Sequence, residues 1–185
     1  MTSPHFSVEY SESRERLTNF FRFILAIPHL LVLNAWGSLV QVLAFIQWWL
    51  ILFTGMRNQG IWNLQNSYLG YASRAYAYTG LLFDKWPAIG ERPGGEPTTY
   101  EFIYEQKAVR LSNFFRPIML IPALFIYFAL LIVTAFALLF SWFTIVIAGK
   151  QPQGFFNFIL KTHRYWITFN AYGLLMTDSY PNSKP

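Results

Sequence analysis

The sequence predicts an all-α membrane protein made of two tandem helical hairpins, with about four membrane segments, interfacial amphipathic helices and short extramembrane segments that could pair as strands. Residues 6–87 and 100–181 match each other at a constant offset of 94 without a gap, which identifies the repeating unit. Only 12% of the residues are charged, about half the share found in soluble domains. Each unit also contains an apolar run long enough to cross a bilayer.

Each unit is predicted to begin with a short strand. Apolar and polar residues alternate at 6–10 and, less regularly, at 100–104, and this alternation is typical of a strand. The two pieces could pair as a small sheet beside the membrane, because either piece alone would be only marginally stable.

The helix that follows the strand carries an arginine stripe. Arg16 and Arg22 lie on one side of this helix, and Arg110 and Arg116 repeat them in the second unit. Apolar residues cover the rest of the helix. The pattern predicts a helix in the membrane interface, with guanidinium groups toward phosphates. We therefore expect these four arginines to contact lipid or a partner.

A long uncharged run follows in each unit. Residues 23–53 would form about 46 Å of helix, compared with a hydrocarbon core of about 30 Å. Because one straight span would leave surplus length, Pro28 is expected to break the helix or to begin it. This places the main spans at about 28–53 and 122–148. The expected C-caps of these two helices are Gly55 and Gly149.

A second, semi-polar segment returns at 61–83 and at 155–177. It is long enough to cross the bilayer, but a charge at mid-bilayer costs about 2.5–3.5 kcal/mol. Crossing is favoured, and an interfacial helix that never crosses stays open as the alternative. Arg74, Lys161 and Arg164 lie in these segments, where they either contact an anionic headgroup or snorkel to the interface.

The distribution of basic residues favours hairpins that cross and return. If each unit is a hairpin, one side holds nine Lys and Arg residues, and the opposite loops hold Arg57 and Lys150. This bias fits the positive-inside rule with both termini cytoplasmic. We therefore expect two parallel hairpins related by a pseudo-twofold axis along the membrane normal. The Gly- and Pro-rich linker at 88–99 is expected to be an exposed, flexible joint.

Two sequence motifs occur in each unit. The first unit contains R-L-x-x-F-F-R-x-x-x-x-I-P at 16–28 and A-Y-x-x-L-L-x-D-x-W-P at 77–87, and the second matches at 148–156 and 170–181. These motifs resemble those of the DUF4389 family of bacterial membrane proteins, so the resemblance implies two tandem copies covering nearly the whole chain. The family has no assigned function, and the resemblance therefore implies no activity.

The two copies also depart from the family pattern. Family members often carry two arginines before the Ala-Tyr pair, whereas the first unit keeps Arg74 and the second keeps Arg164. This difference argues against a strictly twofold site.

Asp84 and Asp178 are the acidic residues tied to the apolar segments. Each could contact a ligand or carry a proton, but the favoured interpretation is a structural ion pair with the arginines of its own unit, Arg16/Arg22 or Arg110/Arg116. The three histidines do not recur between units, cysteine is absent, and no nucleophile or nucleotide-binding motif occurs. The sequence therefore predicts no catalytic, cofactor-binding or metal-binding residues.

These observations favour a non-catalytic accessory subunit or lipid-interacting scaffold of a bacterial inner-membrane complex, multi-pass and with cytoplasmic termini. The expected partners are anionic lipids and a larger membrane complex or homo-oligomer. Nucleic acid is not expected, because the net charge of +5 includes no Lys/Arg run. The alternative is a small oligomeric transporter or channel with polar groups at the repeat interface. A lipid-modifying enzyme ranks last.

Overall fold

The computed structural model describes residues 2–89 and 97–182. Most of the linker predicted at 88–99 therefore lies outside the described residues. In the described part of the chain the elements follow in this order: β1 (His5–Val8), α1 (Arg16–Phe20), α2 (Arg22–Thr54), α3 (Gln59–Thr79), β2 (Thr98–Glu101), α4 (Arg110–Ala148) and α5 (Gln153–Gly173).

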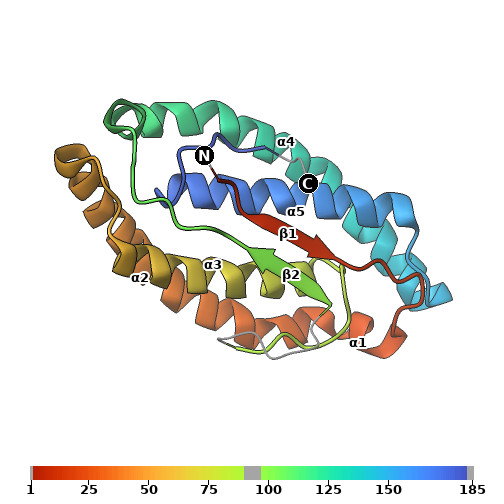
Figure 1. The fold of residues 1–185 in the computed structure, drawn as a ribbon. Coiled ribbons are helices and arrows are strands. Elements are labelled where there is room, and N and C mark those ends of the chain that lie inside the picture. Colours follow the sequence, from red (N-terminus) through yellow and green to blue (C-terminus); the bar gives the residue numbers. More distant parts are fainter. Residues whose placement is uncertain (1, 90–96, 183–185) are drawn as a thin grey trace.

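The helices are arranged around a central pair. Figure 1 shows α3 and α5 side by side in the middle, with α2 and α4 as long outer helices and the β1–β2 ribbon across the front. Helix α3 packs on α2, α5 packs on α4, and the two central helices contact each other. Leu69, Tyr71 and Ala72 of α3 and Ala171 and Tyr172 of α5 are fully buried. The semi-polar segments are thus the core of the fold.

The β1–β2 ribbon marks the symmetry of the duplication. The two strands pair, as the alternating patterns predict, and they are antiparallel, with Phe6 opposite Tyr100. These two residues are equivalent in the two units, because they differ by the repeat offset of 94. A pseudo-twofold axis therefore passes through this pair, perpendicular to the ribbon, and exchanges α2 with α4 and α3 with α5 (Figure 1).

The two hairpins are antiparallel, so the predicted parallel arrangement is wrong. Arg57, in the loop after α2, donates its backbone N–H to Gln106 ahead of α4, at 2.7 Å. The equivalent bond runs from Gln151 to Glu12, at 3.1 Å. The loop end of each hairpin therefore lies against the start of the other. Basic residues are shared between the two ends, and the count that supported cytoplasmic termini no longer holds.

The long helices run through their prolines. Pro28 lies inside α2, and Pro117 and Pro122 lie inside α4, so the predicted break at Pro28 is wrong. Each proline removes one backbone donor, but the turns on both sides continue the helix. As predicted, Gly55 and Gly149 end these helices, with φ angles of 73° and 69°.

Two of the four expected membrane segments have the length and hydropathy of a span within residues 2–89 and 97–182. These are α2 and α4, with mean hydropathies of 1.8 and 2.7. Their most apolar windows are only 28% and 17% buried, unlike the core helices of a soluble protein. Such a large exposed apolar surface gives weak support for membrane association.

Candidate functional site

An arginine–aspartate clasp closes each hairpin. Arg22, at the start of α2, forms an ion pair of 2.6 Å with Asp84, beyond the end of α3. The same guanidinium donates to the carbonyl oxygens of Tyr78 and Phe83, at 2.6 and 2.7 Å, and lies 4.4 Å from the centroid of the Tyr78 ring. The clasp therefore joins the first turn of one helix to the backbone that leaves the other.

The second unit repeats the clasp with different support. Arg116 pairs with Asp178 and donates to the carbonyl oxygens of Tyr172 and Thr177. Asp178 also forms an ion pair with Arg57 of the other unit, with a nitrogen-to-oxygen distance of 2.7 Å. Both side chains are at most 5% exposed. The Asp178 clasp therefore ties the two units together.

The clasp of the first unit has no counterpart of Arg57, because the equivalent position in the second unit is not an arginine. That position holds Gln151, whose side-chain oxygen accepts from Arg14 at 2.9 Å. Arg14 in turn donates to the carbonyl oxygen of Leu82 at 2.8 Å. Burial lowers the pKa of Arg14, and the nearby Asp84 partly offsets this effect. Here the link between units runs through a neutral amide.

The other two arginines of the predicted stripe lie outside the clasps. Arg16 and Arg110 are exposed at opposite ends of the molecule. A Cβ added at Gly149 would lie 3.0 Å from Nε of Arg16, and one added at Gly55 would lie 3.0 Å from Nε of Arg110. Each guanidinium therefore sits over the C-terminus of the long helix from the opposite unit, where a cation is favoured.

The basic residues of the central helices have separate environments. Arg164 donates from Nε to the carbonyl oxygen of Phe6 in the ribbon, at 2.9 Å. Arg74 is buried in α3, with its guanidinium carbon 6.0 Å from the Tyr71 ring centroid. Lys161 is exposed on α5. The structure therefore does not gather these three residues into one site.

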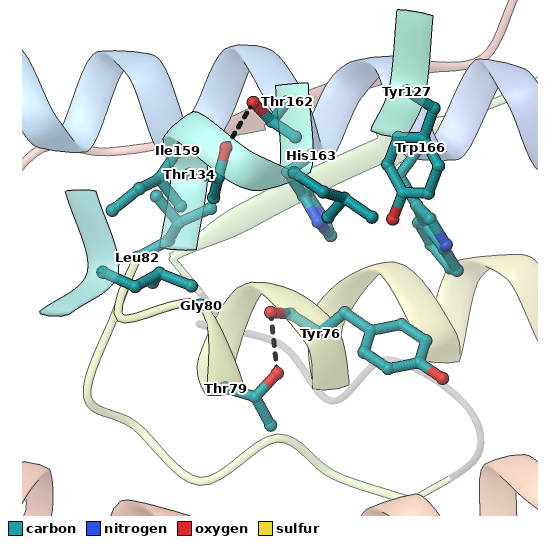
Figure 2. Close-up of a pocket in the computed structure, with 12 residues that line it drawn as sticks. Tyr76, Thr79, Gly80, Leu82, Tyr127, Thr134, Ile159, Thr162, His163 and Trp166 are labelled. Atoms are coloured by element: carbon teal, nitrogen blue, oxygen red, sulfur yellow. Dashed lines mark hydrogen bonds between the residues drawn. The ribbon is translucent and has the colours of Figure 1, made fainter. Parts of the chain in front are cut away.

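A cavity of about 370 Å³ lies between α3, α4 and α5. Figure 2 shows Tyr127, His163 and Trp166 on one side of it and the last turn of α3 on the other. The hydroxyl of Thr134 donates to that of Thr162 at 2.7 Å across its wall. None of its lining side chains is an acid, lysine or arginine: Tyr76, Thr79, Gly80, Leu82, Tyr127, Leu131, Thr134, Leu138, Ile159, Thr162, His163 and Trp166. The cavity is thus neutral, aromatic and partly polar.

His163 brings an imidazole to the wall of this cavity. Burial lowers its pKa to about 4, so its imidazole is neutral at pH 7. Its Nε2 atom is buried and has no hydrogen-bond partner. His29 lies elsewhere, with Nδ1 2.7 Å from the Tyr71 hydroxyl. In the described residues no three His, Cys, Asp or Glu side chains group as they would for a metal ion.

The fold and the site define the class of this protein. It is a duplicated helical hairpin with an apolar outer surface, and a buried Arg–Asp clasp closes each hairpin. The profile of the DUF4389 family, a domain of unknown function, matches residues 16–89 and again 110–183. The chain belongs to this family and contains two tandem copies of its domain. Neither the search of curated proteins nor the search of solved structures finds a match.

Sequence reasoning missed Arg57 and the cavity. Arg57 appeared to be a loop residue on the side opposite the clasps, and the parallel arrangement of hairpins hid its contact with Asp178. One signal for the cavity was available, because Thr162 and His163 stand where the first unit has Tyr68 and Leu69.

Proposed function

We propose that the protein is a non-catalytic, lipid-interacting scaffold that embeds an apolar face in one leaflet of a membrane. The observation that carries this proposal is the length of the exposed apolar surface on α1, α2 and α4. Leu17 is 72% exposed at one end, Met56 is 47% exposed at the other, and large exposed hydrophobic residues recur between them.

The length of this surface favours helices that lie along the membrane. Within α2 the exposed residues run from Phe23 to Phe53, about 45 Å at 1.5 Å per residue, which exceeds the hydrocarbon thickness of about 30 Å. On α4 the exposed residues run from Leu111 to Ile147, about 54 Å. If α4 lay along the membrane normal, its apolar side chains would extend about 12 Å beyond the hydrocarbon core at each end.

The position of the ribbon supports the same orientation. The pseudo-twofold axis passes through the Phe6–Tyr100 pair, so helices along the membrane normal would place the ribbon at mid-bilayer. Open sheet edges do not occur in hydrocarbon, because their N–H and C=O groups need partners. His5 and Glu101, which pair at one end of the ribbon, are exposed as well. With the helices in the membrane plane, the ribbon faces water.

Basic residues at both ends of the long helices support contact with anionic headgroups. Arg16 and Lys150 lie together at one end, and Lys107 and Arg110 at the other. At the first end Lys150 also pairs with Glu12 at 3.0 Å, but both side chains are more than 60% exposed. Exposed charges of this kind attract an anionic surface by about 1 kcal/mol each.

Vesicle flotation tests the proposal. We expect the protein to float with vesicles of phosphatidylglycerol and phosphatidylcholine more completely than with phosphatidylcholine alone. The difference should shrink at 1 M salt, where the Debye length is about 3 Å. The double variant Arg16→Gln/Lys150→Gln should lose this preference, and Lys161→Gln on the central helix is the matched control. A protein that stays in the aqueous fraction with both vesicles would refute the proposal.

We extend the proposal to an accessory subunit in the inner membrane of a bacterium, on the strength of the family resemblance. In this arrangement the ribbon face is left free for a larger complex or a second copy. Extraction into polymer nanodiscs with native lipids, followed by mass spectrometry, should recover a stoichiometric partner or enriched anionic lipid. Recovery of the protein alone with bulk lipid composition would count against this extension.

A further inference from the structure

We propose that the cavity between α3, α4 and α5 binds the hydroxyl head of a neutral lipid alcohol. This inference rests on the proposed membrane embedding and names the lipid that one internal site takes. Four observations carry it: the Nε2 atom of His163 without a hydrogen-bond partner, the absence of charged lining groups, an opening on the apolar face, and the position of Tyr68 at the equivalent place in the first unit.

The first observation is an unsatisfied polar atom. His163 is only 8% exposed, lines the cavity, and has an Nε2 atom without a hydrogen-bond partner. Leaving such an atom without a partner costs about 1–3 kcal/mol. A neutral imidazole offers one donor and one acceptor. A hydroxyl group both donates and accepts, so it satisfies Nε2 in either tautomer.

The second observation is the chemistry of the wall. No acid, lysine or arginine lines the cavity, so a phosphate or carboxylate head would enter without a counter-charge. Tyr127 lies parallel to Tyr165 with ring centroids 6.2 Å apart, and His163 lies parallel to Trp166 at 5.8 Å. These ordered rings provide flat apolar walls around the polar atom. The volume of about 370 Å³ lies within the range of small-molecule sites.

The third observation is a route from the membrane. Leu131, at the edge of the cavity, is 39% exposed on the apolar surface of α4. A second cavity of about 440 Å³ shares Thr79 and Leu138 with the first. Its other lining residues are apolar except Arg22, whose guanidinium is held in the clasp with Asp84. A head group in the first cavity can therefore extend its hydrocarbon chain into the second, beside the lipid-facing helix.

The fourth observation comes from comparing the two units. Thr162 and Leu131 correspond to Tyr68 and Gly37 at the repeat offset. A Cβ added at Gly37 would lie 3.0 Å from the Tyr68 hydroxyl oxygen, so the tyrosine occupies this space in the first unit. The second unit has the smaller Thr162 at this place and the larger Leu131 opposite it, and both line the cavity. The Gly37–Tyr68 contact thus serves as the template for a control variant.

Photocrosslinking in nanodiscs tests the assignment. The probe is a dodecanol with a diazirine near the hydroxyl, and the labelled peptides are mapped by mass spectrometry. We expect saturable labelling of Tyr76, Tyr127 or Trp166, competed by 1-dodecanol but not by dodecane or dodecyl phosphate. Labelling of the exposed face of α2 should rise linearly with probe, because it reports simple partition into lipid.

Two variants separate a specific site from partition. Leu131→Gly/Thr162→Tyr copies the first unit and should abolish the saturable labelling. His163→Leu, which copies Leu69, should weaken competition by dodecanol about fivefold, the change expected for one neutral hydrogen bond. Thermal unfolding in detergent checks that both variants fold. If the double variant does not fold, His163→Leu still tests the site.

Three results would overturn the assignment: labelling of the cavity that does not saturate, equal competition by dodecane, or preferential competition by dodecyl phosphate. Flotation of the wild-type protein is measured beside the crosslinking. If the wild-type protein does not float, the result counts against membrane embedding. If it floats but shows no saturable labelling, only the lipid-alcohol site is rejected.

Discussion

Removing the carboxylate of Asp178 should destabilise the protein more than removing that of Asp84. Asp178 is paired with two guanidinium groups, those of Arg57 and Arg116, and its side chain is 5% exposed. Asp84 is paired with Arg22 and is 17% exposed. Breaking a buried pair by deleting one partner costs about 3–5 kcal/mol, because the remaining charge is buried without compensation. Asp178→Ala leaves two such charges and Asp84→Ala leaves one.

The free energy of unfolding in mixed detergent, followed by tryptophan fluorescence, gives the comparison. We expect Asp178→Ala to lower the free energy of unfolding by about 5 kcal/mol or more, the upper end of the range for a broken buried pair. Asp84→Ala should lower it by about 3 kcal/mol. The control is Glu12→Ala, which breaks the exposed pair with Lys150 and should cost about 0–1 kcal/mol. Equal losses for Asp178 and Asp84, or a loss at Asp178 no larger than that of the control, would refute the reasoning.

Two further stability predictions concern a glycine and a histidine. Gly149→Ala should lower the free energy of unfolding by about 1 kcal/mol or more, because φ is 69° and the new Cβ would lie 3.0 Å from Nε of Arg16. The control is Gly154→Ala, whose new Cβ meets nothing within 4 Å and which should be neutral or stabilising in the same unfolding assay. His163, with its pKa lowered to about 4 by burial, should make stability fall as pH drops from 6.5 to 4. In that window the unfolded chain binds a proton that the folded chain does not. His163→Leu should flatten this part of the pH profile, and an unchanged slope would contradict the assignment.

The sequence predicted those features that depend on local chemistry. The alternating residues at 6–10 and 100–104 form the paired strands, and Gly55 and Gly149 end their helices in the left-handed conformation. The arginine-rich stripes and the two aspartates also lie in the clasps, although Arg16 and Arg110 lie outside them. These features follow from periodicity and from residue types with few conformational choices.

The relation between the two units could not be predicted from one unit. The charge count assumed that equivalent ends lie on the same side, but Arg57 bonds to the start of the other hairpin. Antiparallel packing follows from the isologous pairing of the ribbon, in which Phe6 meets its own repeat equivalent, Tyr100. Pro28 was misleading for a different reason, because the helix on each side of it is long enough to continue.

Some residues that line the cavity differ between the two copies, and a search for repeats does not take such differences into account. Thr162 and Leu131 are unremarkable alone, and their meaning comes from Tyr68 and Gly37 in the first unit. We therefore expect differences between the two halves at the positions where a duplicated chain departs from itself.

The depth of α2 in the bilayer tests the central claim most directly. The chain has no cysteine, so spin labels can be placed singly at Ile24, Val42 and Phe53, which lie on one face of the helix and are 63%, 59% and 70% exposed. Electron paramagnetic resonance then compares quenching by oxygen, which enters lipid, with quenching by a water-soluble nickel complex. A helix in the plane of one leaflet predicts similar depths for all three labels. A label at Val42 near the bilayer centre, with Ile24 and Phe53 close to opposite surfaces, would contradict the account.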